Sequence, residues 1–579
     1  MADPLLAAAD RLASAFAVVS GAEAGSVDPV IRPSDRADAQ ANGALALAKQ
    51  LDRPPRDVAQ AVVAAAGDLD GLGTLEVAGP GFINITFSEQ FLAAELAAIA
   101  ADDALGVRPA EHPATVVIDY SAPNVAKEMH VGHLRSTIIG DALVRLHEAV
   151  GHRVLRENHI GDWGTPFGML IEHLLDLEAT ASTGDLSIDD LDTFYKEARQ
   201  KFEASPEFQD RARNRVVLLQ GGDPETLRLW KLLVAESARY FNRVYELLGV
   251  RLTDDDLSGE STYNHLLPEV LVRLKKAGLL TDSEGADVVF PPGFTNRDGE
   301  PLPLIVQKGA GGFNYAASDL ACVIDRVERL GADTILYVVD AGQAQHFQMV
   351  FKVAEMAGWL APPTRAVHVV FGIVLGEDRK RLRSRSGDTI KLTELLDEAL
   401  VRAEAAVAVK NPGLSPEERA AVARMVGIGA VKYADLSNDR IKDYVFAWDR
   451  MLSFDGNTAP YLQYAHARIC SIFRRAEVDR EAVRSTPPSI TQPQERTLAL
   501  RLLGFDAAVQ SSLEAYQPHR LCGYLFELAQ DFTAFYEACP VLRAPDEATR
   551  ASRLALCDLT ARVIARGLEL LGIDAPDQM

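Results

Sequence analysis

Hydrophobic positions along this chain follow two patterns, which divide it near residue 405. Before that point, short apolar, β-branched runs alternate with stretches in which apolar residues recur every three to four positions. After it, the helical spacing dominates up to the C-terminus. Apolar runs bounded by turns predict buried strands, and the 3.6-residue spacing predicts amphipathic helices. We therefore expect α/β structure first and a bundle of helices afterwards.

Residues 1–105 predict a small α/β module of their own. Besides a helix near the N-terminus, helices are expected over residues 37–51, 55–66 and 88–103. Residues 75–87 predict two strands joined by a turn at Gly79-Pro80-Gly81. One helical face near the N-terminus is made of apolar residues: Leu5, Leu6, Ala9, Leu12, Phe16 and Val19.

The middle of the chain predicts a parallel sheet that is interrupted by helices. Residues 177–256 are charged and helical, with long amphipathic runs at 190–218 and 225–249, and form an insertion between the halves of the sheet. A helix over 345–358 connects two strands of the second half. Strands are expected at residues 116–118, 154–155, 287–290, 302–306, 334–339 and 367–371.

The last third predicts a helical bundle. The amphipathic runs cover residues 417–436, 457–476, 493–515, 517–538 and 549–572.

Composition narrows the class of protein. A chain of 579 residues is too long for one core, so we expect three or four domains. No apolar run approaches the roughly 18 residues of a membrane span, and charges at Asp3, Asp10 and Arg11 argue against a signal peptide. Five cysteines without a Cys-x-x-Cys pair fit buried residues in a reducing, cytoplasmic compartment. The net charge of −23 argues against indiscriminate nucleic-acid binding, although local positive patches can still bind RNA.

The stretch from Val117 to His133 carries the candidate chemistry. A buried strand is broken by Pro123, and a helix starts after Gly132 with a histidine on either side of that glycine. A helix N-terminus attracts anions, and two imidazoles there can donate hydrogen bonds to phosphate oxygens. The alternative is a capped helix with two solvated histidines. A metal pair is disfavoured, because no third ligand stands at a suitable spacing.

These residues resemble a known enzyme family. His130-Val-Gly-His133 is similar to the HIGH signature of class I aminoacyl-tRNA synthetases, and the string from Ser121 to Thr137 resembles arginyl-tRNA synthetases. The run from His159 to Thr165 matches the same family. The basic loop Leu375–Thr389 stands where the family carries its KMSKS signature.

That second signature is degenerate here. Ser384 and Ser386 agree with it, whereas Arg385 replaces its second lysine. The resemblance implies that a lysine ahead of the first signature compensates, and Lys127 occupies that place. A helix capped near Thr389 or Thr393 is expected to follow the loop.

The resemblance implies the whole architecture. Residues 106–404 would form a Rossmann-like class I catalytic domain, with the helical insertion at about 177–256. An additional N-terminal domain, residues 1–105, would contact the tRNA elbow, and residues 405–579 would form a helical anticodon-binding domain.

The resemblance also implies an active site. Lys127, His130, His133 and Arg385 would be catalytic; ATP would contact Asn124, His130, Gly132, His133, Ser384, Arg385 and Ser386; arginine would contact Asp119, Ser121, Asn124, Tyr315, Asp319 and Gln343. From the residues themselves, a carboxylate partner is expected for a permanently charged guanidinium. Asp340 and Gln343 follow a buried strand, and ligands of open α/β sheets bind beyond such strand ends.

The tRNA contacts are implied less directly. Phe82 and Asn84 of the N-terminal module and Met579 at the C-terminus are candidates by resemblance, although Phe82 and Asn84 could equally serve core packing. Asn457, Tyr461 and Tyr464 are spaced to share one helical face, which would suit splayed anticodon bases. A bundle core with buried tyrosines is the alternative.

The function expected from the resemblance is that of an arginine–tRNA ligase. L-arginine, ATP accompanied by Mg²⁺ and tRNA(Arg) are its expected partners, without a dedicated protein metal site, and the enzyme is expected to be a monomer that binds no membrane. Two alternatives remain: a small-molecule nucleotidylyltransferase, which also uses His-x-Gly-His, and a non-catalytic tRNA-binding paralogue. The long helical third speaks against the first and the intact signature against the second.

Overall fold

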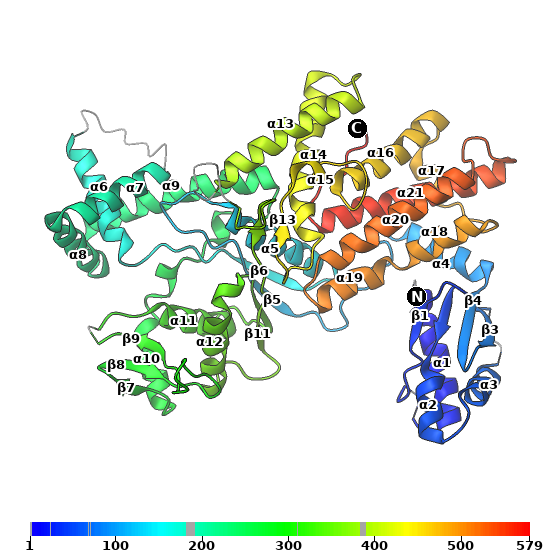
Figure 1. Ribbon diagram of the computed structural model, residues 1–579, viewed down its shortest axis with the longest axis horizontal. Helices are drawn as coiled ribbons and strands as arrows, with labels where there is room; N and C mark the ends of the chain where they lie inside the picture. The colour runs from blue at the N-terminus through cyan, green and yellow to red at the C-terminus, as the bar shows by residue number, and fades with distance from the viewer. Residues whose placement is uncertain are drawn as a thin grey trace. The chain divides into compact units, whose positions relative to one another are not determined.

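The computed structural model describes residues 3–23, 25–67, 69, 71–180, 191–309, 311–382 and 390–579 (Figure 1). The chain forms two compact units. One contains Pro109–Leu452 and Leu570–Ile573, and the other contains Met1–Arg108, Ser453–Glu569 and Asp574–Met579.

A parallel sheet forms the centre of the first unit. Its strands β5 (Thr115–Asp119), β6 (Arg153–Glu157), β10 (Thr334–Tyr337) and β11 (Arg365–His368) lie in the order β11-β10-β5-β6. The pairings β5–β6, β5–β10 and β10–β11 are all parallel. Parallel strands need crossover connections, and helices α5 (Val131–Ala149) and α12 (Ala344–Met356) provide two of them. The carboxyl ends of these strands therefore meet at one edge.

The two halves of the sheet are separated by a long, mainly helical segment. It contains α6 (Pro166–Thr180), α7 (Leu191–Ala204), α8 (Pro206–Gln220), α9 (Pro224–Leu248) and α10 (Leu267–Lys276). An antiparallel sheet of β7 (Thr281–Ser283), β8 (Ala286–Val289) and β9 (Leu304–Gln307) follows, and α11 (Tyr315–Glu328) returns to the parallel sheet. The amphipathic run over 190–218 is divided into two helices, because Ser205 caps α8 and Pro206 opens it.

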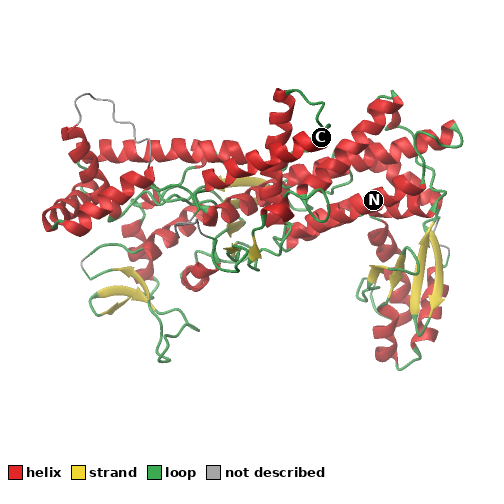
Figure 2. Ribbon diagram, turned by 45° about the horizontal axis from the view of Figure 1, so that its top comes forward, coloured by secondary structure: helices red, strands yellow, loops and turns green. Residues whose placement is uncertain are grey.

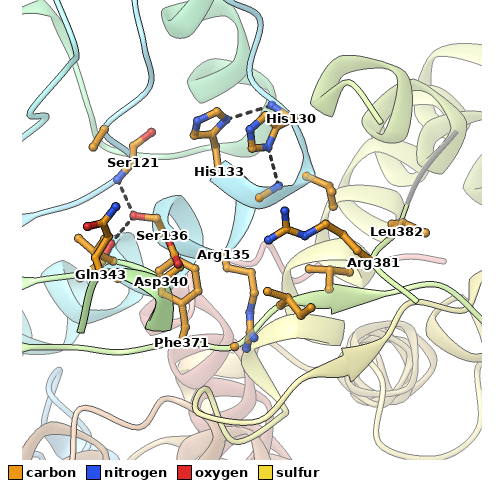
Figure 3. Close-up of a pocket in the computed structure, with 18 of the residues that line it drawn as sticks. Ser121, His130, His133, Arg135, Ser136, Asp340, Gln343, Phe371, Arg381 and Leu382 are labelled. Atoms are coloured by element: carbon orange, nitrogen blue, oxygen red, sulfur yellow. Dashed lines mark hydrogen bonds between the residues drawn. The ribbon is translucent and has the colours of Figure 1, made fainter. Parts of the chain in front are cut away.

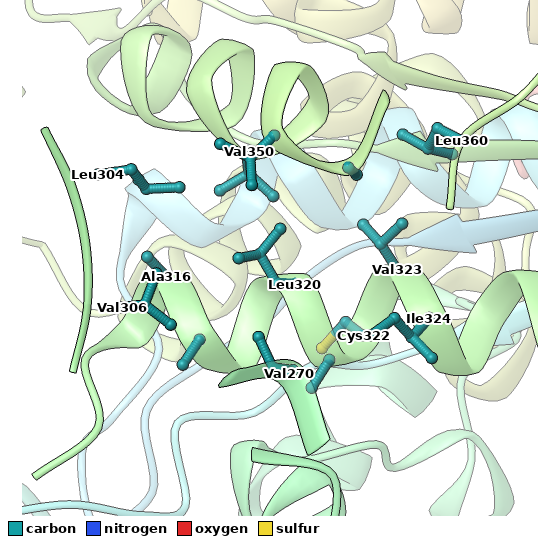
Figure 4. Packing of buried hydrophobic residues seen from close by; sticks show 14 of the residues in the cluster. Val270, Leu304, Val306, Ala316, Leu320, Cys322, Val323, Ile324, Val350 and Leu360 are labelled. Atoms are coloured by element: carbon teal, nitrogen blue, oxygen red, sulfur yellow. The ribbon is translucent and has the colours of Figure 1, made fainter. Parts of the chain in front are cut away.

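Helix α11 is held by a hydrophobic core cluster of this unit (Figure 4). Leu320 and Val323 of α11 pack with Val350 of α12, and the same cluster includes Val117 of β5 and Ile335 of β10. Helix α5 covers the other face, where Gly140 lies so close to Tyr120 that a Cβ would come within 2.3 Å of the ring. The sheet is thus covered on both faces, as parallel sheets require.

The rest of this unit is tied to helix α5. It contains β12 (Val374–Leu375), α13 (Leu392–Lys410), α14 (Pro416–Leu436), β13 (Tyr444–Val445) and α15 (Trp448–Met451). The buried guanidinium of Arg135 in α5 lies 2.9 Å from the buried carboxylate of Asp435 in α14. The helix predicted after the basic loop is α13, which starts at Leu392 behind Lys391; Lys391 makes no side-chain cap, Thr393 lies inside the helix, and Thr389 lies outside the described residues.

The second unit begins with the N-terminal module, whose small sheet Figure 2 shows in yellow. It contains α1 (Pro4–Ser20), β1 (Ile31–Pro33), β2 (Ala39–Ala41), α2 (Gly43–Leu51), α3 (Pro55–Ala66), β3 (Gly73–Ala78), β4 (Phe82–Phe87) and α4 (Glu89–Ala101), with antiparallel strand order β1-β2-β4-β3. The helix predicted over 37–51 starts only at Gly43. Residues 39–41 pair with β4 instead, a distant partner that local periodicity does not reveal.

The helical bundle completes this unit. Its helices are α16 (Ala459–Ala476), α17 (Arg480–Val483), α18 (Pro493–Leu503), α19 (Phe505–Glu514), α20 (His519–Ala538) and α21 (Glu547–Leu570). The run predicted over 493–515 is divided at Gly504, which caps both α18 and α19. Among the described residues, no helix is long and apolar enough to cross a bilayer.

Candidate active site

A cavity of about 430 Å³ opens at the carboxyl edge of the parallel sheet (Figure 3). Its walls come from the loop after β5, the start of α5, the segments that follow β10 and β11, and Arg381 with Leu382. The predicted residues Ser121, Asn124, His130, Gly132, His133, Asp340 and Gln343 all line it. The lining residues that were not predicted as site residues include Arg135, Ser136, Phe371 and Arg381.

The loop after β5 holds strained backbone. Ser121, Ala122 and Ala126 have φ values of 73°, 47° and 59°, in the left-handed region that non-glycine residues rarely adopt. Side chains fix each of them: Ser121 N–H donates to Ser136 Oγ at 2.9 Å, Ala122 N–H to Asn158 Oδ1 at 3.0 Å and Ala126 N–H to Ser237 Oγ at 2.9 Å. Strain maintained in this way is characteristic of functional sites.

The HVGH segment caps its own helix. The backbone N–H of His130 donates to Nδ1 of His133, and the N–H of Gly132 donates to Nδ1 of His130, both at 3.0 Å. An Nδ1 that accepts a hydrogen bond carries no proton, so in neutral rings the proton is on Nε2. The two rings stack with centroids 4.0 Å apart. Both imidazoles therefore use one nitrogen for the helix cap and keep Nε2–H as a donor.

Both rings are neutral at physiological pH. Burial, and then the positive charges of Arg381 and Lys127, lower the pKa of His130. Burial, His130 and Lys127 lower the pKa of His133 to about 3. Near pH 7 the segment thus offers N–H donors and a helix N-terminus, while Arg381 and Lys127 supply the positive charge.

Gly132 is needed because the His130 ring occupies the space of its missing side chain. A Cβ on Gly132 would lie 2.7 Å from Cε1 and 2.9 Å from Nδ1 of His130. Gly132→Ala is expected to rotate the ring and break the Gly132–His130 hydrogen bond, which lowers the activation rate by roughly tenfold or more. Pyrophosphate exchange measures this effect, with Gly523→Ala in α20 as the control, because a Cβ there would meet no atom within 4 Å. A normal exchange rate in Gly132→Ala would contradict the steric argument.

The predicted KMSKS-like residues Ser384, Arg385 and Ser386 lie outside the described residues. The segments on either side of them contact the HVGH region. Arg381 and Leu382 line the cavity. After the gap, Val131 N–H donates to Ile390 O at 3.1 Å, and Leu392 N–H donates to Met129 O at 2.9 Å.

Lys127 is not among the residues that line the cavity. Its ammonium lies 4.4 Å from the centroid of the Tyr195 ring, which belongs to α7 of the helical insertion. It is nevertheless close enough to His130 and His133 to lower the pKa of both.

Asp119, at the end of β5, is paired within the protein. Its Oδ2 accepts a hydrogen bond from the buried guanidinium of Arg326 at 2.8 Å, and the same guanidinium donates to Glu157 at 2.5 Å. Asp119 is outside the cavity lining, and one of its oxygens is occupied by Arg326.

Tyr315 and Asp319 form a separate group with His346. Asp319 Oδ2 lies 2.5 Å from His346 Nε2, and the rings of Tyr315 and His346 are 4.7 Å apart. The Tyr315 side chain is 59% exposed. His346 lies in the first turn of α12, three residues after Gln343 of the cavity wall. No local pattern in the sequence indicated a site role for His346.

Gly161 packs against the loop that carries the cavity residue Asn124. Gly161 N–H donates to Pro123 O, and Val125 N–H donates to Gly161 O, both at 3.1 Å. A Cβ on Gly161 would lie 2.4 Å from Asn124 Oδ1. The glycine therefore gives Asn124 its position.

The candidate RNA-binding residues are in the other unit. Phe82 and Asn84 lie on β4, and Asn84 accepts a hydrogen bond from Gln40 at 2.8 Å. Helix α16 starts at Ala459, so Asn457 precedes the helix instead of sharing its face with the two tyrosines. Tyr464 is 39% exposed.

The chain ends against α16. Gln463 donates to Asp574 O at 2.7 Å, and Arg474 donates to Asp577 O at 3.1 Å. Met579 belongs to this closing segment.

Comparisons with known proteins agree along the whole chain. Three family models match: "tRNA synthetases class I (R), catalytic domain" over residues 95–448, "DALR anticodon binding domain" over 462–579 and "Arginyl tRNA synthetase N terminal domain" over 7–87.

Full-length relatives and structures agree as well. The chain is 54% identical to the arginine–tRNA ligase of Thermobifida fusca, with 100% of both chains covered, and 49% identical to that of Edwardsiella ictaluri, with 98% and 99% covered. Two arginyl-tRNA synthetase structures are each 27% identical to this chain and each cover 99% of it. The structure from Plasmodium falciparum has a TM-score of 0.84, with 99% of its own chain covered. The structure from Thermus thermophilus has a TM-score of 0.79, with 100% of its own chain covered. This chain therefore belongs to the arginyl-tRNA synthetase family of class I aminoacyl-tRNA synthetases.

Proposed function

We propose that this chain joins L-arginine to tRNA(Arg) in two steps at the cavity of the parallel sheet. A carboxylate oxygen of arginine attacks the α-phosphorus of ATP, the bond to the β-phosphate breaks and pyrophosphate leaves. A hydroxyl of the 3′-terminal ribose then attacks the arginyl carbonyl, and AMP leaves. The observation that carries this proposal is the pair of neutral histidines at the N-terminus of α5, which present N–H donors at a strand-end cavity.

The triphosphate is assigned to the HVGH segment. Nε2–H of His130 and of His133 donates to phosphate oxygens, and Gly132 leaves room for the His130 ring. In such a reaction, positioning and electrostatic stabilisation do most of the work. Mg²⁺ would neutralise charge on the phosphates. Asp340 is the one carboxylate among the described lining residues, which fits a cation that arrives on the ATP better than a protein cage.

The leaving pyrophosphate is assigned to positive charges on both sides of the HVGH segment. Arg381 lines the cavity, and the charge of Lys127 lowers the pKa of both imidazoles. We also assign Ser384, Arg385 and Ser386 to the pyrophosphate, because the residues before them line the cavity and the residues after them contact the HVGH segment.

The arginine guanidinium is assigned to Asp319, with Tyr315 beside it. Ser121, Asn124 and Gln343 would hold the rest of the amino acid at the cavity wall. Asp119 is the weaker candidate for the guanidinium, because its Oδ2 already accepts from Arg326.

Lys127 gives a kinetic test. Lys127→Ala is expected to lower kcat by about tenfold or more with a smaller rise in the KM for ATP, because its charge acts mainly as pyrophosphate leaves. Steady-state pyrophosphate exchange at varied ATP measures both constants. Tyr195→Leu, which removes the ring under the ammonium and keeps the charge, serves as the control. An effect confined to KM would make Lys127 a ground-state contact.

The tRNA is assigned to the second unit. Tyr461 and Tyr464 of α16, with Asn457 before the helix and Met579 after α21, would meet anticodon bases by stacking and edge hydrogen bonds. Phe82 and Asn84 would meet the tRNA elbow. We propose a monomeric enzyme of the cytoplasm.

Pyrophosphate exchange across several amino acids, with and without tRNA, tests the proposed function. Exchange with arginine and with no other amino acid supports it. Exchange with none would favour a non-catalytic tRNA-binding paralogue, and adenylylation of a free small molecule would favour a nucleotidylyltransferase.

A further inference from the structure

A second cavity, of about 460 Å³, lies within the unit that contains the helical bundle. Arginines dominate its wall: Arg480 and Arg484 come from α17 and its C-terminal cap, and Arg562 and Arg566 come from α21. His466 of α16, Asp103, which follows α4, and Glu569 of α21 also line it. We term it the arginine cavity.

The spacing of these arginines is unfavourable for the helices that carry them. Arg562 and Arg566 are four residues apart on one face of α21, and Arg480 and Arg484 have the same separation. Like charges at this spacing destabilise a helix. Two such pairs converge on one cavity in a chain whose net charge is −23. A bound anion would account for an arrangement that folding itself disfavours.

The acidic partners of these arginines are either shared or exposed: Asp558 serves both Arg480 and Arg484, and Glu481 and Glu569 lie at the surface. Arg480 Nε donates to the buried Asp558 at 2.8 Å, whereas Arg484 reaches only 3.6 Å from Asp558, beyond a normal hydrogen bond. Arg484 is also 3.7 Å from the exposed Glu481. Its fork of N–H donors is therefore available to a ligand.

Arg562 is the most constrained of the four. Its N–H groups donate to the carbonyl oxygens of Ala100 at 2.6 Å and Asp102 at 3.2 Å, which are neutral acceptors. Burial lowers its pKa, and Arg484 and Arg480 lower it further, against the opposing effect of Asp558 and Asp103. Arg566 pairs at 2.8 Å with Glu569, which also lines the cavity and whose side chain is 54% exposed. A phosphate between these guanidiniums would relieve their mutual repulsion.

A cation at the neighbouring group is the competing interpretation. Ligand atoms of His466, Cys470 and Asp577 lie within 4.8 Å of one another. However, Arg480 donates to Cys470 Sγ at 3.6 Å, which places a positive charge beside the thiol. Burial raises the pKa of Cys470 to about 11, so the sulfur is a neutral thiol and not a thiolate ligand. The electrostatics favour an anion.

We propose that the arginine cavity binds a backbone phosphate of RNA, and, resting on the proposed function, that this RNA is the tRNA substrate. Guanidinium forks match phosphate oxygens in geometry and charge. Two residues along a helix turn a side chain by about 200°, so His466 points away from the face of Tyr464. The cavity is thus a separate contact from the tyrosines that are candidates for base recognition. Phosphate contacts of this kind position a nucleic acid without reading its sequence.

The test is the salt dependence of tRNA binding by the full-length protein. In a double variant, Arg484→Gln with Arg566→Gln, the slope of log K against log salt concentration should fall by about 1 to 2, since each lost phosphate contact removes about 0.7–0.9. The KM for tRNA should rise by about tenfold with kcat nearly unchanged. Both side chains are partly exposed, at 40% and 32%, so the fold should tolerate the changes.

Two further variants sharpen the result. Arg520→Gln, an exposed arginine of the same unit that does not line the cavity, should leave slope and KM unchanged. Arg484→Lys with Arg566→Lys keeps the charges and should restore most of the slope. The loss in the glutamine variant should be equal for cognate and non-cognate tRNA.

The outcomes separate the two proposals. If the parent charges tRNA with arginine but the double glutamine variant keeps its slope and KM, the cavity is not an RNA contact and the proposed function stands. If the parent does not charge tRNA, the proposed function fails instead. A second arm titrates inorganic tripolyphosphate into both proteins. A tripolyphosphate site lost in the variant, with an unchanged tRNA slope, would assign the cavity to a free polyphosphate and overturn the RNA proposal.

Discussion

Asp319→Asn is expected to lower kcat/KM for arginine by two orders of magnitude or more. The substitution keeps the shape of the side chain and removes the charge that we assign to the guanidinium. A charged pair that loses one partner typically costs about 3–5 kcal/mol, because the other charge is stranded. Asp319 is partly buried, with 17% of its side chain exposed, and His346 remains beside it, so we expect the lower end of that range. ATP binding should stay normal.

Citrulline makes the Asp319 experiment specific. It is neutral and nearly the same shape as arginine, so the parent should reject it strongly and Asp319→Asn far less, because specificity is a difference between two affinities. Asp325→Asn, on the same helix and paired with Arg329, is the matched control. Competition assays on the parent and both variants give the arginine-to-citrulline ratio. The same ratio in the parent and in Asp319→Asn would leave Asp119 as the surviving carboxylate.

His133→Ala is expected to slow arginine activation by roughly 100-fold or more, as the loss of one preorganised donor does at other charge-stabilising sites. The variant loses the Nε2–H donor and also the Nδ1 acceptor that fixes the backbone of His130. Arginine affinity should change far less, because Tyr315 and Asp319 are in a separate group. Single-turnover activation separates the two effects.

Two variants identify which property of His133 matters. His133→Gln keeps a donor and an acceptor and should recover part of the rate. His265→Ala removes an exposed histidine of the same unit and should have no effect. Activation by His133→Ala at the parental rate would be incompatible with a phosphate role for the segment.

The sequence predicted the elements whose signals are local. The helix over 55–66 was predicted with the bounds that α3 has, since proline and glycine mark its ends. Residues 39–41 were mistaken for helix, because their strand depends on pairing with β4, more than 40 residues away. Gly504 divides a run that remains periodic across it. Local patterns therefore fixed most helices, whereas pairing decided the strands.

The contrast between local patterns and distant partners also applies to the candidate site. HVGH and its glycine are contiguous, so the sequence could indicate a phosphate-binding helix start. The partners that decide side-chain roles are distant: Arg326 lies 207 positions from Asp119, and His346 lies 27 positions from Asp319 on the next helix. The hydrogen bonds that fix the imidazole tautomers depend on the backbone path, which the residue types do not specify.

The left-handed residues of the loop after β5 have a consequence for attempts to make this protein more heat-resistant. Glycine adopts such a conformation without the penalty of roughly 1 kcal/mol that other residues incur. A selection for melting temperature would therefore favour Ala122→Gly, whose Cβ is the source of that penalty. The same change would increase the flexibility of the backbone between Ser121 and Asn124, which both line the cavity. Thermostability gained here would come at the expense of turnover, and a screen that scores both would reject it.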